Sequence, residues 1–283
     1  MSVSRPASAR PRSDSSADHG PQQAPSDEEL TAIEDHRVVW ARLLGATVED
    51  DLALRGRLVT HRAPGSSLNF VAGIRWPAGE ASSWLARAIA VMSDRGIWPS
   101  VIVCDGLTTP TDLTAQLRAA GWLPVSSERI MWTRHPAVVP HLDASLRVEA
   151  VTPESALECA RLETEVFGLM PDAIGESAEL LATSVADGTT RAYLVKLHGE
   201  PVASARLVPG PVVAGLHAIG VAGRQRRRGY GRMLTTVATR AGLATGHRLV
   251  WLSVDEANAA AVNLYRSLGF EPAFAWTRWL APA

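Results

Sequence analysis

A loop rich in glycine and arginine, at residues 223–231, is the stretch of this chain best suited to chemistry. It follows a short apolar segment at 214–222 and precedes an amphipathic helical pattern. Gly229 and Gly231 allow a sharp turn and leave backbone N–H groups unshielded, while the following helix points the positive end of its dipole at them. The arginines at 226–228 add positive charge. These features predict a binding site for a phosphorylated ligand at a helix N-terminus.

A second pattern lies downstream, after a predicted helix and strand. Asn258 opens a helix that carries the pair Leu264–Tyr265 and ends in Gly269–Phe270. The Arg-x-x-Gly-x-Gly loop resembles the acyl-CoA signature of the GCN5-related N-acetyltransferases (GNAT), and this helix is similar to the second signature of that family. Both motifs occur in the family's order. The resemblance covers residues 147–283 and is weaker for the first half.

The resemblance implies an enzyme that transfers an acetyl group directly from acetyl-CoA to the primary amine of an acceptor, without a metal. It places Tyr265 where the family's tyrosine protonates the departing thiolate. His217 is the second catalytic candidate. The residues expected to contact the donor are Ile219, Gly220, Val221, Arg226, Arg227, Arg228, Gly229, Tyr230, Gly231, Arg232 and Asn258.

The general base is left open by the sequence. Many family members use a glutamate on the fourth strand, but alignment on the glycine loop places Gly215 at that position. His217 lies two residues further on the same side of the predicted strand and could accept a proton near neutral pH. Glu163 and Glu165, on the helix before a predicted acceptor pocket, are alternatives, and a water relay could replace any single base.

Other interpretations of the glycine loop compete with acetyl transfer. An ordinary strand-to-helix turn with solvated arginines needs no ligand, and a dinucleotide fold would use Asp255 as its ribose-binding acid. Leu234 at the position of the third glycine argues against the dinucleotide fold. A non-catalytic acyl-CoA-binding module would explain the missing strand glutamate. Nucleic-acid binding by the arginine run would weaken steeply with salt.

Composition limits the remaining possibilities. The 283 residues are 46% hydrophobic and carry a net charge of −1, so no global field favours nucleic acid or an anionic membrane. Cys104 and Cys159 lie apart in apolar segments, which indicates a reducing, cytoplasmic location. The longest uncharged run, 207–223, is too short to span a bilayer, and no secretory signal is expected. We expect a monomer or homodimer without nucleic-acid, membrane or metal partners.

The order of predicted elements indicates an α/β protein of two GNAT-like domains, each a mixed β-sheet flanked by helices. A disordered tail (1–25) precedes a degenerate GNAT-like domain (26–134), a linker (135–146) and a catalytic GNAT domain (147–283). A capping box at Ser26 predicts the first helix, which should end near Gly45. The segment from there to residue 67 is expected to be polar and without strands.

An internal duplication is predicted from the alignment of the two halves. Ala119-Ala120-Gly121-Trp122 matches Ser267-Leu268-Gly269-Phe270, and the strands before these segments then fall within one residue of register. The first copy lacks the arginine loop and has Leu117 in place of Tyr265, so it should not bind CoA in the same way. Its role is left open between a brace, half of the acceptor pocket and a dimerisation surface.

Overall fold

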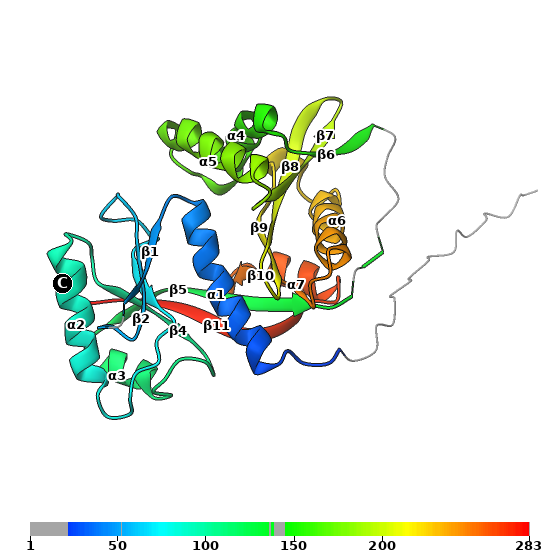
Figure 1. Ribbon diagram of the computed structural model, residues 1–283. Helices are drawn as coiled ribbons and strands as arrows, with labels where there is room; N and C mark the ends of the chain where they lie inside the picture. Colours follow the sequence, from blue (N-terminus) through cyan, green and yellow to red (C-terminus); the bar gives the residue numbers. More distant parts are fainter. Residues whose placement is uncertain (1–21, 52, 136, 139–144, 283) are drawn as a thin grey trace, which may run out of the picture.

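The strands of the computed structural model form one continuous mixed sheet, within the described residues 22–51, 53–135, 137–138 and 145–282 (Figure 1). Its eleven strands are β1 (Thr47–Asp51), β2 (Gly56–Thr60), β3 (Phe70–Ala72), β4 (Ser100–Cys104), β5 (Leu123–Thr133), β6 (Leu146–Ala150), β7 (Arg191–Leu197), β8 (Glu200–Pro209), β9 (Ala214–Val221), β10 (Val250–Asp255) and β11 (Glu271–Leu280). The α-helices are α1 (Asp27–Leu43), α2 (Ala81–Asp94), α3 (Leu113–Ala119), α4 (Ala156–Phe167), α5 (Ile174–Ala186), α6 (Tyr230–Ala244) and α7 (Ala259–Arg266). The expected mixed sheet flanked by helices is confirmed.

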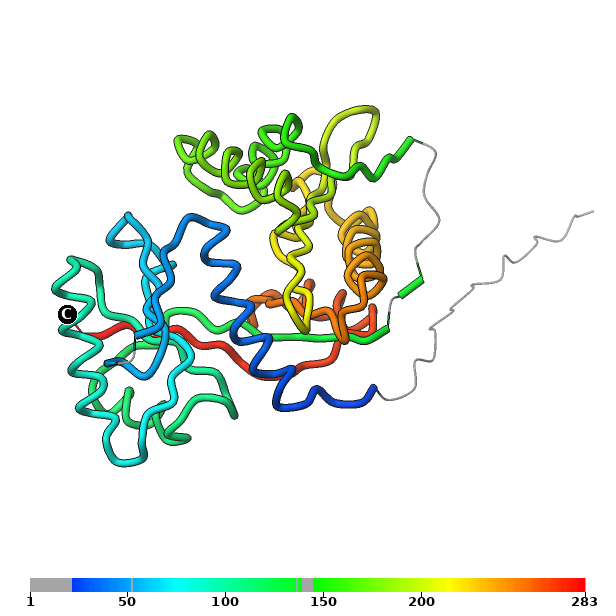
Figure 2. The backbone as a smooth tube through the Cα atoms, in the orientation of Figure 1, coloured from blue at the N-terminus to red at the C-terminus, as the bar shows by residue number. Residues whose placement is uncertain are grey.

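The two halves exchange their last strands. The order is β1-β2-β3-β4-β11-β5-β10-β9-β8-β7-β6, so β5 of the first half lies between β10 and β11, and β11 of the second half lies between β4 and β5. Figure 2 shows the green β5 and red β11 side by side, and they pair antiparallel along most of their lengths. The parallel pairs β3–β4 and β9–β10 flank this centre at equivalent positions. This arrangement supports the predicted duplication.

Helices cover both faces of the sheet. Apolar side chains of α1 pack against the middle strands on one face, where they join Trp132, Trp251 and Trp276. Helix α4 lies on the same face, because its Glu163 and the Trp40 ring of α1 both contact Arg206 of β8. The helices α2, α3, α6 and α7 cover the opposite face. Helix α1 belongs to the first half and packs where the halves meet, against β1 of the first half and against β9 and α5 of the second (Figure 1).

Local signals predicted some elements well and missed others. The Ser26 capping box is present, with the Ser26 backbone N–H donating to Glu29 at 2.8 Å, and α1 ends one residue before its C-cap, Leu44. The β1–β2 hairpin was not predicted, because β1 has the acidic sequence Thr-Val-Glu-Asp-Asp and exposes most of its side chains. The strand expected from Asn69 to Trp76 is limited to Phe70–Ala72, since Gly73 turns with φ +66°.

The domain boundaries expected from the sequence stay predictions. Most of the expected disordered tail (residues 1–21) and of the linker (139–144) lies outside the described residues. Residue 22, also assigned to the tail, is held in place: the Gln22 amide donates to the Gly269 carbonyl at 2.6 Å and accepts from the Arg134 backbone N–H at 2.7 Å. The exchanged strands mean that each half completes its part of the sheet with a strand from the other.

Buried histidines should make folding sensitive to acid. Burial lowers the pKa of His36 to about 4, while an unfolded histidine titrates near 6.5. The unfolded state therefore binds more protons between these values, and the free energy of unfolding should fall as the pH drops from 6.5 to 4, by up to about 3 kcal/mol. We expect His36→Phe to lose less stability than the wild type between pH 7 and pH 4.5 in urea unfolding. An equal loss in both proteins would contradict this assignment.

Candidate active site

The sheet opens between β9 and β10. Their parallel ladder joins Ala214–Leu216 to Val250–Leu252 and then stops, whereas β9 continues to pair with β8 as far as Val221. A bulge on β9 places two residues, Ala218 and Ile219, opposite Ala205 of β8, and Ala218 has φ +49°. Residues 218–221 consequently turn their β10-facing backbone groups into the opening. Such unpaired N–H and C=O groups are suited to an extended, amide-containing ligand.

The glycine–arginine loop lies at the end of β9 and has the geometry of an anion site. Gly229 is the N-cap of α6 with φ +86°, Arg227 has φ +66°, and no side chain caps the helix. The first N–H groups of α6 are therefore free to bind an anion. Arg226, Arg227 and Arg228 are exposed and form no ion pair within the described chain.

The other predicted loop residues have packing roles as well. The Tyr230 ring is buried among Met233 and neighbouring apolar side chains, so its backbone rather than its hydroxyl faces the loop. The Arg232 guanidinium donates to the Ser267 hydroxyl at 2.7 Å and links α6 to the end of α7. Gly231 has ordinary room for a Cβ, which would lie 3.5 Å from Leu264.

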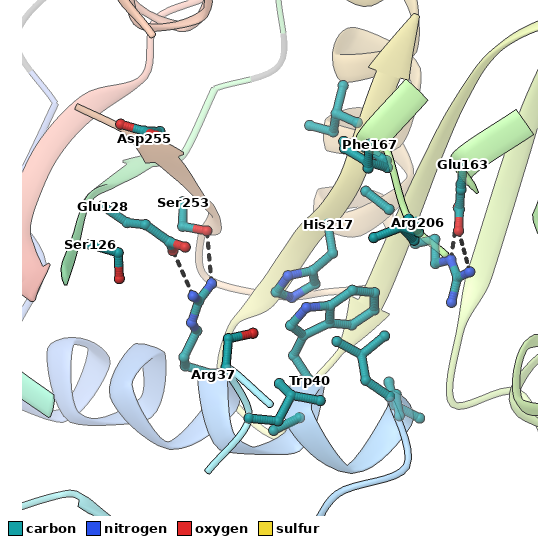
Figure 3. Close-up of a pocket in the computed structure, with 18 of the residues that line it drawn as sticks. Arg37, Trp40, Ser126, Glu128, Glu163, Phe167, Arg206, His217, Ser253 and Asp255 are labelled. Carbon is teal, nitrogen blue, oxygen red and sulfur yellow. Dashed lines mark hydrogen bonds and ion pairs between the residues drawn. The ribbon is translucent and has the colours of Figure 1, made fainter. Parts of the chain in front are cut away.

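A cavity of about 800 Å³ connects the opening with the face covered by α1 (Figure 3). Both halves of the chain contribute to its wall. Residues from the first half that line it include Arg37, Trp40, Ser67, Ser126 and Glu128, and residues from the second half include Glu163, Arg206, His217, Ile219, Asp255, Asn258, Tyr265 and Arg278. The cavity therefore exists only where the two halves meet.

Tyr265 reaches the cavity from α7, on the opposite face of the sheet. Its ring is buried beside Phe270, and burial raises the pKa of its hydroxyl to about 12. The hydroxyl has no hydrogen-bond partner among the described residues. It is therefore protonated at neutral pH and free to donate, as a general acid must be.

Asn258 opens α7 as predicted. It is the N-cap residue, and its side-chain oxygen accepts from the Ala261 backbone N–H at 3.1 Å. Its exposed side chain also lines the cavity. Capping accounts for one of its hydrogen-bonding groups and leaves the side-chain amide available to a ligand.

His217 lies in a stack of aromatic rings. Its imidazole is parallel to Trp40 with centroids 4.3 Å apart and lies edge-on to Trp251, and Figure 3 shows it against the Trp40 ring. Burial and the neighbouring His36, Arg37 and Arg206 hold its pKa well below the usual value. Its Nε2 is buried without a hydrogen bond within the described chain. His217 is therefore a neutral and weak base.

Gly215, the position that aligns with the strand glutamate of many GNAT enzymes, has no space for a side chain. A Cβ on Gly215 would lie 2.6 Å from His217 Nε2 and 2.8 Å from His36 Cε1. His36 comes from α1, so the first half of the chain occupies the volume that a glutamate would need. A general base cannot be supplied from this position.

The comparisons with known proteins agree with this geometry. Residues 159–270 match the Acetyltransferase (GNAT) family. The chain contains a GNAT-family domain. Over 87 residues it is 41% identical to a mycothiol acetyltransferase of Thermobispora bispora, a match that spans 30% of this chain and 27% of that relative's length.

Two solved structures show the same fold over most of the chain. A GCN5-related N-acetyltransferase from Kribbella flavida superposes with a TM-score of 0.64 at 20% identity, covering 87% of this chain and 95% of its own. A tandem GNAT protein from the clavulanic acid biosynthesis pathway superposes with a TM-score of 0.60 at 19% identity, covering 81% and 79%. The predicted family and the tandem GNAT fold are thus confirmed.

The two glutamates considered as bases differ in this GNAT domain. Glu163 is buried and forms a bidentate ion pair with Arg206, whose Nε donates to it at 2.9 Å. Arg206 also lies over the Trp40 ring. Glu165, two residues on, is exposed and does not line the cavity. Glu163 is committed to the ion pair, and Glu165 is remote from the opening.

Sequence reasoning missed the cavity residues of the first half. Arg37 forms an ion pair with Glu128 at 2.6 Å and donates to the Ser253 hydroxyl at 2.9 Å (Figure 3). Glu128 is the cross-strand partner of Asp255, so two carboxylates lie side by side near the GNAT opening. No local pattern marks these residues, because they come from α1, β5 and β10 and meet only through the strand exchange.

Among the described residues, no helix combines the length and apolar content needed to cross a membrane. The same part of the chain holds no group of three or more histidine, cysteine, aspartate or glutamate side chains placed to bind a metal ion.

The His36 and His217 rings lie so close to Gly215 that we expect a larger residue there to destabilise the protein. Gly215→Ala should lower the free energy of unfolding by about 1–3 kcal/mol, because the added Cβ overlaps two buried rings. Gly175→Ala is the control, since a Cβ there meets no atom within 4 Å and the residue lies in α5. Urea unfolding checks both. Equal stabilities of Gly215→Ala and the wild type would contradict the packing described here.

Proposed function

We propose that this protein is an N-acetyltransferase that moves an acetyl group from acetyl-CoA directly to a primary amine, with Tyr265 as the general acid. The observation that carries the proposal is the opening between β9 and β10, which has an anion-binding loop at its end and a protonated tyrosine in its wall. Acetyl transfer needs this combination of a remote anchor, an oriented thioester and a proton donor for the leaving thiolate.

The residues present fit an elongated, anionic thioester. Arg226, Arg227 and Arg228 are exposed and the N-terminus of α6 is uncapped, so the loop can bind the phosphates. Those backbone groups of Ile219, Gly220 and Val221 that face away from β8 can bind the pantetheine amides, with Asn258 as a further contact. When bound, acetyl-CoA supplies the activated acetyl group, and the chain supplies its position.

We assign proton removal from the acceptor to a group other than His217, the candidate expected from the sequence. His217 has a buried Nε2 and a low pKa, which favour a packing role over proton transfer. Asp255 is exposed at the cavity wall and forms no ion pair within the described residues. We therefore propose that the ammonium proton leaves through water towards Asp255, whereas Glu128 is held in its ion pair with Arg37. Tyr265 then donates its hydroxyl proton to the sulfur of the departing CoA thiolate.

The acceptor would bind on the α1 face. The cavity extends there from the opening, and α1 and β5 of the first half form much of its wall. Among the roles considered for the first half, this supports a share in the acceptor pocket. A cytoplasmic location, a monomeric or homodimeric state and the absence of nucleic-acid or membrane partners stay predictions.

The role of Tyr265 can be tested by removing its hydroxyl. Tyr265→Phe should lower kcat by about 100-fold or more with any amine that the wild type acetylates, because the thiolate would lose its proton donor. The Kd of acetyl-CoA should change less than about twofold, since no binding contact is assigned to the hydroxyl. Steady-state kinetics and calorimetry provide the two values.

The matched control is Tyr193→Phe, which removes a hydroxyl from a tyrosine that does not line the cavity. It should leave both parameters unchanged. Unchanged turnover in Tyr265→Phe would reject the general-acid role. A wild-type protein that binds acetyl-CoA but acetylates no amine would instead support the acyl-CoA-binding module.

The donor loop can be tested by charge. In Arg226→Gln/Arg227→Gln/Arg228→Gln, acetyl-CoA should bind at least about 10-fold more weakly, because several charge-assisted contacts to phosphate are lost. Gly229→Glu/Gly231→Glu should abolish binding at what we expect to be one site per chain. The control is Gly65→Glu, at a glycine of the first half with no atom within 4 Å of an added Cβ. Calorimetric titration measures all four proteins, and binding of wild-type strength in the loop variants would reject the site.

A further inference from the structure

Three arginines line the cavity, and their surroundings differ. Arg37 is paired with Glu128, and Arg206 is paired with Glu163. Arg278, on β11, has no carboxylate within ion-pair distance among the described residues. It is therefore the lining guanidinium whose charge the described part of the protein leaves unbalanced.

The Arg278 guanidinium is hydrogen-bonded through its Nε atom, whereas its Nη atoms are available to a ligand. Its Nε donates to the buried Ser100 hydroxyl at 3.3 Å, and that hydroxyl donates in turn to the Asn69 carbonyl at 2.5 Å. The Nη groups have no hydrogen bond within the described residues. Arg278 is only partly exposed, and this burial lowers the pKa of its guanidinium from the ordinary value. An anion at the Nη groups would relieve the cost of that burial.

Two serine hydroxyls line the same cavity, and one of them lies beside Arg278. Ser126 is the cross-strand partner of Arg278, so both side chains lie on the face covered by α1. Ser67 also lines the cavity, and neither hydroxyl has a hydrogen-bond partner within the described chain. Arginine and serine together form the donor set that binds carboxylate or phosphate oxygens.

The charges along this face are ordered. Asp255 on β10 and Glu128 on β5 lie towards the opening, Trp276 on β11 is the cross-strand partner of Glu128, and Arg278 follows two residues further along β11. Strands lie about 4.8 Å apart and two residues span about 6.6 Å along a strand, so the Arg278 Cα is about 8 Å from that of Glu128 and about 12 Å from that of Asp255, a mean of about 10 Å. The wall is acidic at Asp255, carries the Arg37–Glu128 ion pair over the Trp276 ring in the middle, and is cationic at Arg278.

We infer that the acceptor is an amine that carries an anionic group, a carboxylate or a phosphate, about 10 Å from its nitrogen, and that Arg278 binds this group. The inference rests on the proposed function for the placement of the amine near the opening. Arg278 then determines specificity, and α-amino acids are too short to span the site. A guanidinium binds a planar carboxylate through two parallel N–H bonds, a geometry that lysine does not reproduce.

A set of linear probes tests the inference. 8-Aminooctanoate has the required length, its primary amide keeps the length without the charge, and 6-aminohexyl phosphate places a phosphate the same number of bonds from the nitrogen. Calorimetry with CoA-saturated wild-type protein should give at least about 10-fold tighter binding of an anionic probe than of the amide. The stronger of the two anions identifies the group, and glycine should not bind. Equal affinities for the anions and the amide would overturn the inference.

Variants of Arg278 locate the effect. Arg278→Gln should remove the advantage of the anionic probe and leave the amide within about twofold, while Arg278→Lys should keep part of it. Arg240→Gln is the control, at an exposed arginine of α6 outside the cavity. An advantage that persists in Arg278→Gln would also overturn the inference.

Measurements of turnover distinguish a failure of this inference from a failure of the proposed function. CoA release from acetyl-CoA should follow the order of affinities. Binding of the anionic probe that depends on Arg278, without any turnover of any amine, would leave the anion site intact and reject the acetyltransferase. Turnover of neutral and anionic amines with equal kcat/KM would keep the enzyme and reject the role of Arg278.

Discussion

The antiparallel pairing of β5 with β11 is the constraint on which the rest of the structure depends. Each strand ends one half of the chain and lies inside the sheet of the other, so the halves share hydrogen bonds at the centre of an eleven-stranded sheet. This pairing places Glu128 of the first half opposite Trp276 of the second, and Ser126 opposite Arg278. The cavity between the halves is therefore fixed by backbone hydrogen bonds, which hold its wall more firmly than contacts between loops would.

The opening between β9 and β10 is a local departure from regular sheet geometry. The bulge at Ala218 directs β9 along β8 and away from β10, which leaves backbone groups without partners. Glycine at position 220 permits this path of β9, because a Cβ there would lie 2.5 Å from Val166 at the end of α4. Unpaired backbone groups are costly when buried, so the opening is suited to a ligand that restores their hydrogen bonds.

Helix α1 connects the degenerate half with the chemistry of the other half. It brings His36 and Trp40 against His217, and it brings Arg37 to Glu128 and Ser253. Burial keeps the two histidines of the stack neutral at pH 7, while the ion pair lines the cavity. A side chain at position 215 and the observed packing of α1 exclude each other, because His36 lies where the Cβ would be. The halves have become interdependent, although the first lacks a donor loop of its own.

The sequence by itself determined the features that depend on neighbours along the chain. The Gly229–Gly231 loop, the Asn258 cap, Tyr265 on its helix and the Ser26 capping box are all local patterns, and the structure has each where the spacing predicted it. The sequence also indicated the duplication. Only the tertiary structure decided that the halves exchange strands, that His217 is buried in a stack, and that Arg278 lines a cavity with Ser126. The physical reason is that strand pairing and burial depend on residues more than a hundred positions apart, which leave no periodic signal in either segment.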